Sequence, residues 1–301
     1  MPLKRYFEFV RFSHTVFALP FALLSAAMAA YLDPPPLRYW AGIVLAMVAG
    51  RTVAMGYNRI ADRFIDASNP RTQSRHLPAG TLSLKSAVGM TLLSAVIFVA
   101  STLLFLPENP WPLVLSIPVL AFLCLYSYTK RFTSLAHFWL GAALMLAPVS
   151  AWIAVRGPDV AKDPWDLLPA LCLGLGVLFW VAGFDIIYAL LDVTFDTESG
   201  IFSIPGRWGV PRAIWCARCS HFVAFLFFAL LPLVYPEFGL IYLSGVLGIG
   251  VLLIYEHAIV RPDDVARINQ AFFQVNTIIS LGLLFVGLLD LFLLANAAAG
   301  G

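Results

Sequence analysis

The sequence predicts an all-α integral membrane protein, built as a bundle of nine transmembrane helices. Of its 301 residues, 60% are hydrophobic and only 12% are charged, which is far from the composition of a soluble domain. The charges are clustered, so that eight stretches of at least 18 residues contain no Asp, Glu, Lys or Arg. A helix of this length crosses the ~30 Å hydrocarbon core of a bilayer. The alternation over ~10-residue segments that marks a membrane β-barrel is absent.

The expected spans follow one another in a single transmembrane domain that covers residues 1–301. A ninth candidate begins at 39–50 and continues past Arg51 toward Asn58. In order, the spans are 12–32, 39–58, 86–107, 109–129, 132–155, 167–184, 219–236, 238–255 and 268–289. Short loops that contain proline follow the odd-numbered spans, whereas long polar segments, 58–85 and 185–213, follow the second and the sixth.

The distribution of basic residues predicts the orientation in the membrane. With nine spans, the N-terminus shares a side with the loops that follow the even-numbered spans. That side collects fifteen lysines and arginines, and the opposite side only three. Because basic residues concentrate on the cytoplasmic side, we expect the N-terminus and both long polar segments to be cytoplasmic, in a bacterial-type inner membrane.

The two long polar segments resemble each other, which predicts two pseudo-repeated halves. Asp62 and Asp192 are 130 residues apart, and so are Asp66 and Asp196. Each segment follows an even-numbered span and ends in a Pro/Gly turn, "LPAG" in the first and "IPGRWG" in the second. Membrane proteins built from internal repeats often form their site where the halves face each other.

Each segment carries a set of three polar side chains that a continuous helix would bring onto one face. Successive members are four residues apart in the first set, and seven and then four in the second, so they lie within ~40° of each other. The first acidic set is Asn58, Asp62 and Asp66, and the second acidic set is Asp185, Asp192 and Asp196. Stacked carboxylates repel, and near a membrane each must be paired or solvated. Cations are therefore expected beside them.

Two kinds of cation fit this pattern. The first explanation is pairing with the arginines of the first segment, Arg59, Arg63, Arg71 and Arg75. The second is Mg²⁺, which prefers oxygen ligands and is held by one or two carboxylates together with substrate phosphates. A diphosphate would then bridge the two acidic sets while basic residues bind its outer oxygens. The repetition of spacing, sidedness and turn chemistry favours the second explanation.

Four motifs together resemble the UbiA-type intramembrane aromatic prenyltransferases, over nearly the whole chain. The motifs are "NRIADRFIDASNPRT", "SRHLPAG", "YSYTKRF" and "DIIYALLDVTFDTESGIFSIPGRWG". In that family a paired-aspartate motif in each half binds Mg²⁺ and prenyl diphosphate. Many relatives read N-D-x-x-D in the first motif, whereas Asn58 is followed here by Arg59, so one acid is replaced.

The resemblance implies a role for each matching residue at the diphosphate. The implied metal ligands are Asn58, Asp62, Asp66, Asp192 and Asp196. Lys130 and Arg131 match a basic pair near the diphosphate, and Arg75 matches the arginine of an R-x-L-P-A-G turn. We add Arg63, from the first motif, as a fourth cation that assists departure of the diphosphate.

Three further residues are expected to meet the aromatic acceptor or the prenyl carbocation. Asp185 matches an acid beside the acceptor, where it would polarise a hydroxyl or take a proton; alternatively it extends the metal-binding set. Arg11 resembles the family's arginine for the acceptor carboxylate; alternatively it is a basic anchor at the start of a helix. The ring of Tyr188 would stabilise the cation.

The expected function is Mg²⁺-dependent transfer of a polyprenyl group from a prenyl diphosphate to an aromatic carboxylic acid in quinone biosynthesis. The leading acceptor is 4-hydroxybenzoate, and the alternative is 1,4-dihydroxy-6-naphthoate. A transporter is the alternative from another class, although it would place its ionisable groups nearer the middle of its helices. The expected partners are these substrates and the lipid bilayer, with no nucleic acid and no obligatory protein partner.

Overall fold

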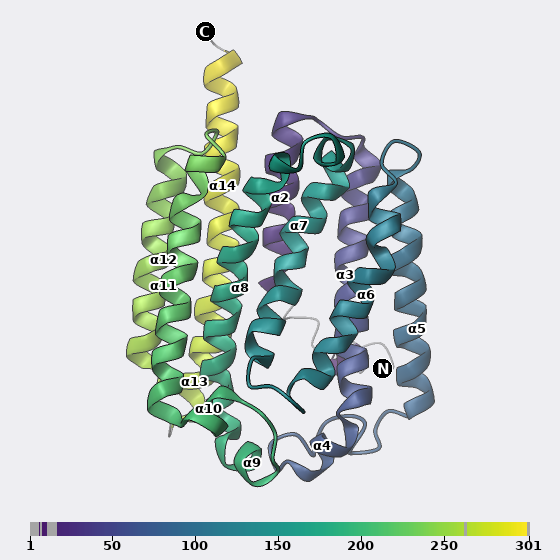
Figure 1. Cartoon of the computed structure of the whole chain (residues 1–301), viewed down its shortest axis with the longest axis vertical. Coiled ribbons are helices and arrows are strands. Elements are labelled where there is room, and N and C mark those ends of the chain that lie inside the picture. The colour runs from purple at the N-terminus through teal and green to yellow at the C-terminus, as the bar shows by residue number, and fades with distance from the viewer. Residues whose placement is uncertain (1–5, 7, 11–16, 262–263, 300–301) are drawn as a thin grey trace.

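The computed structural model describes residues 6, 8–10, 17–261 and 264–299. Throughout these residues every regular element is helical, which confirms the predicted all-α class. The long helices run side by side, and the short helices α4 (Arg63–Ser68), α9 (Val193–Glu198), α10 (Ile204–Trp208) and α13 (Val265–Gln270) gather at one end (Figure 1). We call this the α4/α9 end.

The nine expected spans correspond to nine helices of the described chain. These are α2 (Leu19–Leu32), α3 (Leu37–Ala61), α5 (Leu84–Ser101), α6 (Trp111–Thr129), α7 (Ala136–Lys162), α8 (Leu168–Ala189), α11 (Val210–Val234), α12 (Leu240–Ile259) and α14 (Asn276–Ala299). Shorter helical turns are η2 (Thr102–Phe105), η3 (Pro164–Leu167), η4 (Leu190–Asp192) and η5 (Ala271–Val275). Eight of the nine are long and apolar enough to cross a membrane, and α2 is shorter, with 14 residues.

Proline fixes where several of these helices begin. A proline lies in the first turn of four of them, where its missing N–H has no helical partner to lose. These prolines are Pro20, Pro112, Pro169 and Pro211.

Helix α8 occupies the middle of the bundle, between α7 and α11 (Figure 1). Many of its side chains are buried, including Phe184 and the fully buried Trp180. A glycine permits close approach on the α7 side: a Cβ atom at Gly141 would lie 2.2 Å from the carbonyl oxygen of Leu178 in α8. Small residues allow membrane helices to pack this closely. The contact matters for the site, because the next turn of α7 toward its N-terminus carries His137.

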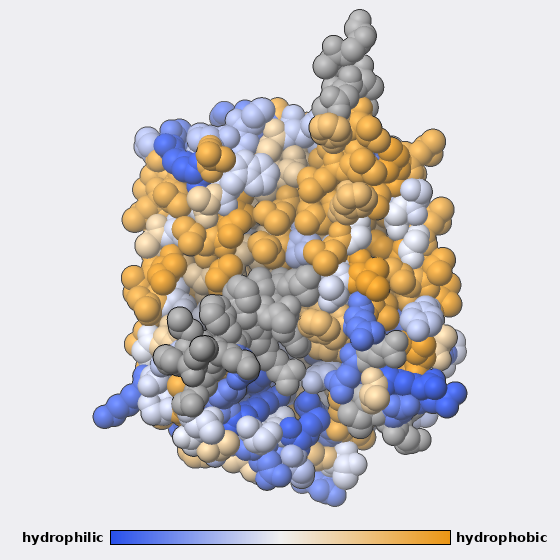
Figure 2. Space-filling model, turned by 180° about the vertical axis from the view of Figure 1, so that it is seen from behind, coloured by the Kyte–Doolittle hydropathy of each residue, from blue (hydrophilic) through white to orange (hydrophobic). Residues whose placement is uncertain are grey.

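The outer surface agrees with a position in the bilayer. Large apolar side chains such as Leu92, Leu233 and Val251 are exposed on the long helices. Figure 2 shows an apolar band across the molecule and a concentration of hydrophilic residues at the α4/α9 end. The chain is therefore a multi-pass membrane protein whose polar residues gather mainly at one end.

Candidate active site

The two acidic sets lie at the α4/α9 end, where a long helix gives way to a short one (Figure 1). Asn58 lies in the last turn of α3, Asp62 at the junction and Asp66 in α4. In the other half, Asp185 lies in α8, and Asp192 and Asp196 follow it in η4 and α9. The pseudo-repeat predicted from the sequence is therefore visible as the same helix–junction–helix arrangement in both halves.

Neither set lies along one continuous helix, so that part of the prediction is wrong. Each helix breaks at the middle aspartate: Asp62 has φ −94° and ψ 2°, and Asp192 has φ −115° and ψ 6°. This bridge region of the backbone map is sparsely occupied and common at active sites. The break directs successive carboxylates toward different partners, which reduces the repulsion that a straight stack would impose.

Basic residues from elsewhere in the first half pair with the first acidic set. The Asp62 carboxylate lies 2.6 Å from Lys130 Nζ and 3.4 Å from Arg131 Nη2. Asp66 Oδ1 accepts a hydrogen bond from Arg75 Nη1 at 2.6 Å. Asp66 Oδ2 is buried, has no hydrogen-bond partner in the described chain, and lies 3.9 Å from Arg59 Nη1. This oxygen therefore has an ion-pair partner but no hydrogen bond among the described residues.

Arg71 joins the first half to the second acidic set. Its Nε donates to Asp192 Oδ1 at 2.8 Å, and its Nη2 forms an ion pair with Asp192 Oδ2. Asn69 Nδ2 also donates to Asp192 Oδ1, at 3.0 Å. Burial lowers the pKa of Arg71, but its hydrogen bonds to Asp192 and Tyr188 outweigh burial and raise that pKa above its ordinary value. The guanidinium is therefore charged at any physiological pH.

Two aromatic rings lie beside this contact. Arg71 Nη1 donates to Tyr188 Oη at 3.1 Å, and the guanidinium carbon lies 5.2 Å from the centre of the Tyr188 ring. Tyr188 stacks on Phe272, with 4.2 Å between the ring centres. Tyr188 thus lies beside the Arg71–Asp192 ion pair, with one ring face covered by Phe272.

Lys130 lies between the two acidic sets. Besides pairing with Asp62, it lies within electrostatic range of the buried Asp196, which also forms a hydrogen bond with Ser203. The backbone N–H of Phe202 donates to the Lys130 carbonyl oxygen at 2.8 Å. The segment that follows α9 is therefore fixed to the loop between α6 and α7, and the two halves are in direct contact.

Asp185 is separated from the other carboxylates and has a histidine as its partner. His137 Nδ1 lies 2.7 Å from Asp185 Oδ2. His137 is buried and Asp185 is partly exposed, with 7% and 20% of their side chains accessible. This contact distinguishes Asp185 from the aspartates that pair with lysine or arginine.

One of the predicted substrate-binding residues, Arg63, forms no ion pair with these described carboxylates. Arg63 Nη1 donates to the carbonyl oxygen of Ile60 at 2.8 Å, and its guanidinium lies over the exposed ring of Phe64, 4.2 Å from its centre. Arg11 lies outside the described residues.

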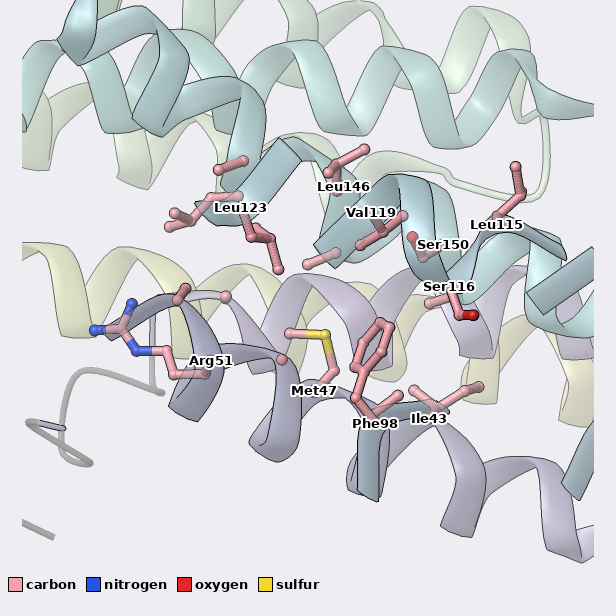
Figure 3. Close-up of a pocket in the computed structure, with 18 of the residues that line it drawn as sticks. Ile43, Met47, Arg51, Phe98, Leu115, Ser116, Val119, Leu123, Leu146 and Ser150 are labelled. Atoms are coloured by element: carbon pink, nitrogen blue, oxygen red, sulfur yellow. The ribbon is translucent and has the colours of Figure 1, made fainter. Parts of the chain in front are cut away.

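An apolar cavity adjoins the first acidic set, between α3, α5, α6 and α7. It begins near Asn58, Arg51 and Tyr126 and continues past Met47 toward Phe105. Figure 3 shows Arg51 at one end, Ser116 and Leu115 near the other, and Met47 and Phe98 between them. The α3 residues that line it, from Ile43 to Asn58, span ~22 Å at ~1.5 Å per residue.

Arg51 is the charged residue of this cavity. Its Nε atom is buried and has no hydrogen-bond partner among the described residues. Tyr126, which lines the same cavity, lies within electrostatic range of Arg51, Asp62 and Asp185. The cavity therefore ends in a polar region that reaches both acidic sets.

The sequence alone does not identify four residues of this site: Arg51, Asn69, Arg71 and His137. Arg51 carried the clearest signal, because it is a charge within an expected span. The sequence indicates only a counter-ion at Arg71, and nothing in its local sequence distinguishes it from Arg63. His137 and Asn69 carried no signal, since single histidines and asparagines are common near helix ends.

The carboxylates do not converge on one point. Among the described residues, no group of three or more His, Cys, Asp and Glu side chains is arranged as a metal site. The sets instead provide separate oxygen donors on either side of Lys130 and Arg71. Such an arrangement suits a ligand that extends from one half to the other.

Comparison with known proteins shows to which family the chain belongs. The profile of the UbiA prenyltransferase family matches residues 18–278, which include both acidic sets. The chain belongs to the UbiA prenyltransferase family. It is thus an enzyme, an aromatic prenyltransferase, and the transporter alternative is set aside.

Relatives within the UbiA family resemble the chain over most of its length. A 4-hydroxybenzoate octaprenyltransferase of Aromatoleum aromaticum is 30% identical over 245 residues, which cover 80% of this chain and 78% of the relative. A protein of the same name from Nitrosomonas eutropha is 30% identical over 249 residues, covering 82% and 81%.

Solved UbiA structures share the fold. The apo structure of a UbiA homolog from Aeropyrum pernix K1 is 31% identical, with a TM-score of 0.81 over 92% of this chain and 97% of that chain. A UbiA homolog from Archaeoglobus fulgidus, bound to GPP and Mg²⁺, is 16% identical, with a TM-score of 0.66 over 96% and 99%. At that identity the likeness concerns the fold alone.

Proposed function

We propose that this enzyme transfers a polyprenyl group from a prenyl diphosphate to 4-hydroxybenzoate, with Mg²⁺ as its cofactor. One observation carries the proposal: the acidic sets of the two halves lie on either side of Lys130 and Arg71, near an apolar cavity that ends at Arg51, whose Nε atom is buried. The relatives named 4-hydroxybenzoate octaprenyltransferase support this choice of acceptor.

The donor atoms of the acidic sets fit Mg²⁺. All of them are carboxylate or amide oxygens, the ligands that this ion prefers, and Asp66 Oδ2 is a buried oxygen without a hydrogen-bond partner in the described chain. The residues that would hold the metal are Asn58, Asp62, Asp66, Asp192 and Asp196. When bound, Mg²⁺ supplies positive charge that stabilises the departing diphosphate.

The lysine and arginines of the site are more accessible than the carboxylates they pair with. The Lys130 side chain is 29% exposed and that of Asp62 only 1%. The values are 23% for Arg75 against 5% for Asp66. A diphosphate that arrives at the α4/α9 end therefore meets cations first. Together with Arg71, these cations bind its outer oxygens through charge-assisted hydrogen bonds.

The apolar cavity accommodates the prenyl chain and excludes water from the carbocation that forms at its diphosphate end. Tyr188 presents an aromatic ring to that cation. Arg51 pairs with the carboxylate of the acceptor, and Asp185 accepts a proton from it. Arg51 thereby takes the role expected from the sequence for Arg11.

A direct assay tests the proposal. Purified protein receives Mg²⁺, a prenyl diphosphate and either 4-hydroxybenzoate or 1,4-dihydroxy-6-naphthoate, and the product is identified by mass. We expect prenylated 4-hydroxybenzoate. A product from the naphthoate alone would assign the menaquinone route, and no product from either acceptor would refute the proposal.

Two controls address the metal. Excess EDTA should abolish turnover, because the lysine and arginines alone then offset too little of the charge on the departing diphosphate. Asp62→Asn should lower turnover by about 100-fold or more, the usual cost of removing one group that stabilises the leaving charge. Full activity in EDTA would remove Mg²⁺ from the proposal.

A further inference from the structure

Both ring nitrogens of His137 have partners. Nδ1 lies 2.7 Å from Asp185 Oδ2, and Nε2 lies 3.3 Å from the backbone nitrogen of Ile204. A backbone N–H only donates, so Nε2 must be the unprotonated acceptor. The proton of the neutral imidazole is then on Nδ1, from which it donates to the Asp185 carboxylate.

The partners of His137 come from three different elements. His137 lies in the first turn of α7, Asp185 in α8, and Ile204 at the start of α10. Ile204 is fully buried. The hydrogen bond from Phe202 N to Lys130 O fixes the same segment two residues earlier. His137 therefore connects Asp185 to a segment that is already fixed by the diphosphate-binding side of the site.

The two oxygens of Asp185 differ as a result. Oδ2 is held by His137, whereas Oδ1 accepts no hydrogen bond from any described residue. The side chain is 20% exposed and lies within electrostatic range of Tyr126 at the polar end of the cavity. One oxygen is held by His137, and the other has no hydrogen-bond partner among the described residues.

We propose that His137 is the positioning residue for Asp185, which it orients so that Oδ1 accepts the proton released by the aromatic acceptor. This inference rests on the proposed function. In the reaction, a ring carbon ortho to the hydroxyl bonds to C1 of the prenyl group while the C1–O bond breaks, and its electron pair leaves with the diphosphate. The ring carbon then loses its proton to Asp185 Oδ1, which later releases it to water.

His137 itself does not receive this proton. Its Nδ1 already carries a hydrogen, and its Nε2 is occupied by Ile204. Its contribution is orientation, and misplacing a catalytic group by ~1 Å can cost ~100-fold in rate.

A matched pair of substitutions separates the two hydrogen bonds. In His137→Asn the amide nitrogen replaces Nδ1, so the bond to Asp185 is kept and the one to Ile204 is lost. In His137→Gln the amide oxygen replaces Nε2, so the bond to Ile204 is kept and the one to Asp185 is lost. We expect kcat to remain within about threefold of wild type in His137→Asn and to fall about 100-fold in His137→Gln.

The KM for prenyl diphosphate and a double variant show whether His137 acts through the position of Asp185. The KM for prenyl diphosphate should not change in either variant, because the contacts of Lys130 and Arg71 are kept. Asp185→Asn should lower kcat at least as far as His137→Gln, and the double variant should be no worse than Asp185→Asn alone. The matched control is His221→Asn: His221 is also buried and also uses both ring nitrogens, toward His257 and the Trp180 carbonyl oxygen, and it has no hydrogen bond to Asp185.

Three outcomes would overturn the inference. In the first, both His137 variants lose activity only in proportion to a fall in melting temperature. The His221→Asn control would show the same relation if its substitution destabilised the protein. In another, His137→Asn is the less active of the two. In the third, the losses from His137→Gln and Asp185→Asn multiply in the double variant. Failure of the wild-type enzyme to prenylate any aromatic acid would instead refute the proposed function, and this inference with it.

Discussion

At the scale of single residues, Arg51 differs from every other cation of the site. The described ion pairs connect Lys130, Arg131, Arg75 and Arg71 to aspartates, but none of them includes Arg51. A charged side chain at membrane depth is costly unless it has a partner or faces a cavity that receives one. Arg51 lies in an apolar cavity and has a buried Nε without a partner in the described chain. An anionic ligand that enters this cavity would give the Arg51 guanidinium a hydrogen-bonded partner.

Replacement of Arg51 tests this role. Arg51→Met keeps an unbranched side chain and removes the charge, so the fold should be retained. Loss of one hydrogen-bonded charge pair costs about 1.5–3 kcal/mol, which corresponds to an increase of about 10- to 100-fold in the KM for 4-hydroxybenzoate. The KM for prenyl diphosphate should not change. Steady-state kinetics with each substrate varied in turn measures both values.

Arg11 provides the comparison for this experiment. If Arg11→Met raised the acceptor KM while Arg51→Met left it unchanged, the acceptor carboxylate would belong to Arg11, as the sequence motif implied. A similar increase in both variants would mean that the two arginines share the carboxylate.

At the scale of elements, the contact between α7 and α8 sets the geometry of the site. His137 lies one turn before Gly141 in α7, and Asp185 lies two turns after Leu178 in α8. The close approach of Gly141 to Leu178 thus holds together the two helices that carry the His137–Asp185 hydrogen bond. Any residue larger than glycine at this position would move the helices apart.

Gly141→Ala is therefore expected to reduce stability and activity together. Its Cβ atom would lie 2.2 Å from a backbone oxygen, and backbone does not yield as a flexible side chain does. Overpacking of this kind costs about 1–3 kcal/mol. The control is Gly89→Ala in α5, where no described atom would lie within 4 Å of the new Cβ. Melting temperature in detergent and kcat measure both effects, and equal behaviour of the two variants would refute this account of the α7–α8 contact.

At the scale of the whole molecule, the sequence predicted what depends on local composition. The spans follow from the lengths of uncharged stretches, and the two halves from the 130-residue repeat of the aspartates. The contacts that complete the site depend on packing between distant segments. Arg71 meets Asp192 across 121 residues, and His137 meets Asp185 across 48. No spacing rule relates such pairs, so single residues of the site were missed although its location was predicted.

The distribution of lysines and arginines along the chain predicts the orientation of the molecule in the membrane. Hydrophilic residues concentrate at the α4/α9 end (Figure 2), and the polar segments 58–85 and 185–213 that form it are rich in arginine. Positively charged loops remain in the cytoplasm. We therefore predict that the active site opens to the cytoplasm, where a soluble aromatic acid reaches it directly. Single cysteines at two exposed positions, Ser199→Cys beside α9 and Lys162→Cys at the opposite end, test this in a variant without the native cysteines. A membrane-impermeant thiol reagent should label Ser199→Cys in inside-out vesicles and Lys162→Cys in intact spheroplasts. The reverse pattern would place the site on the outer side, and would require the acceptor to cross the membrane before it is prenylated.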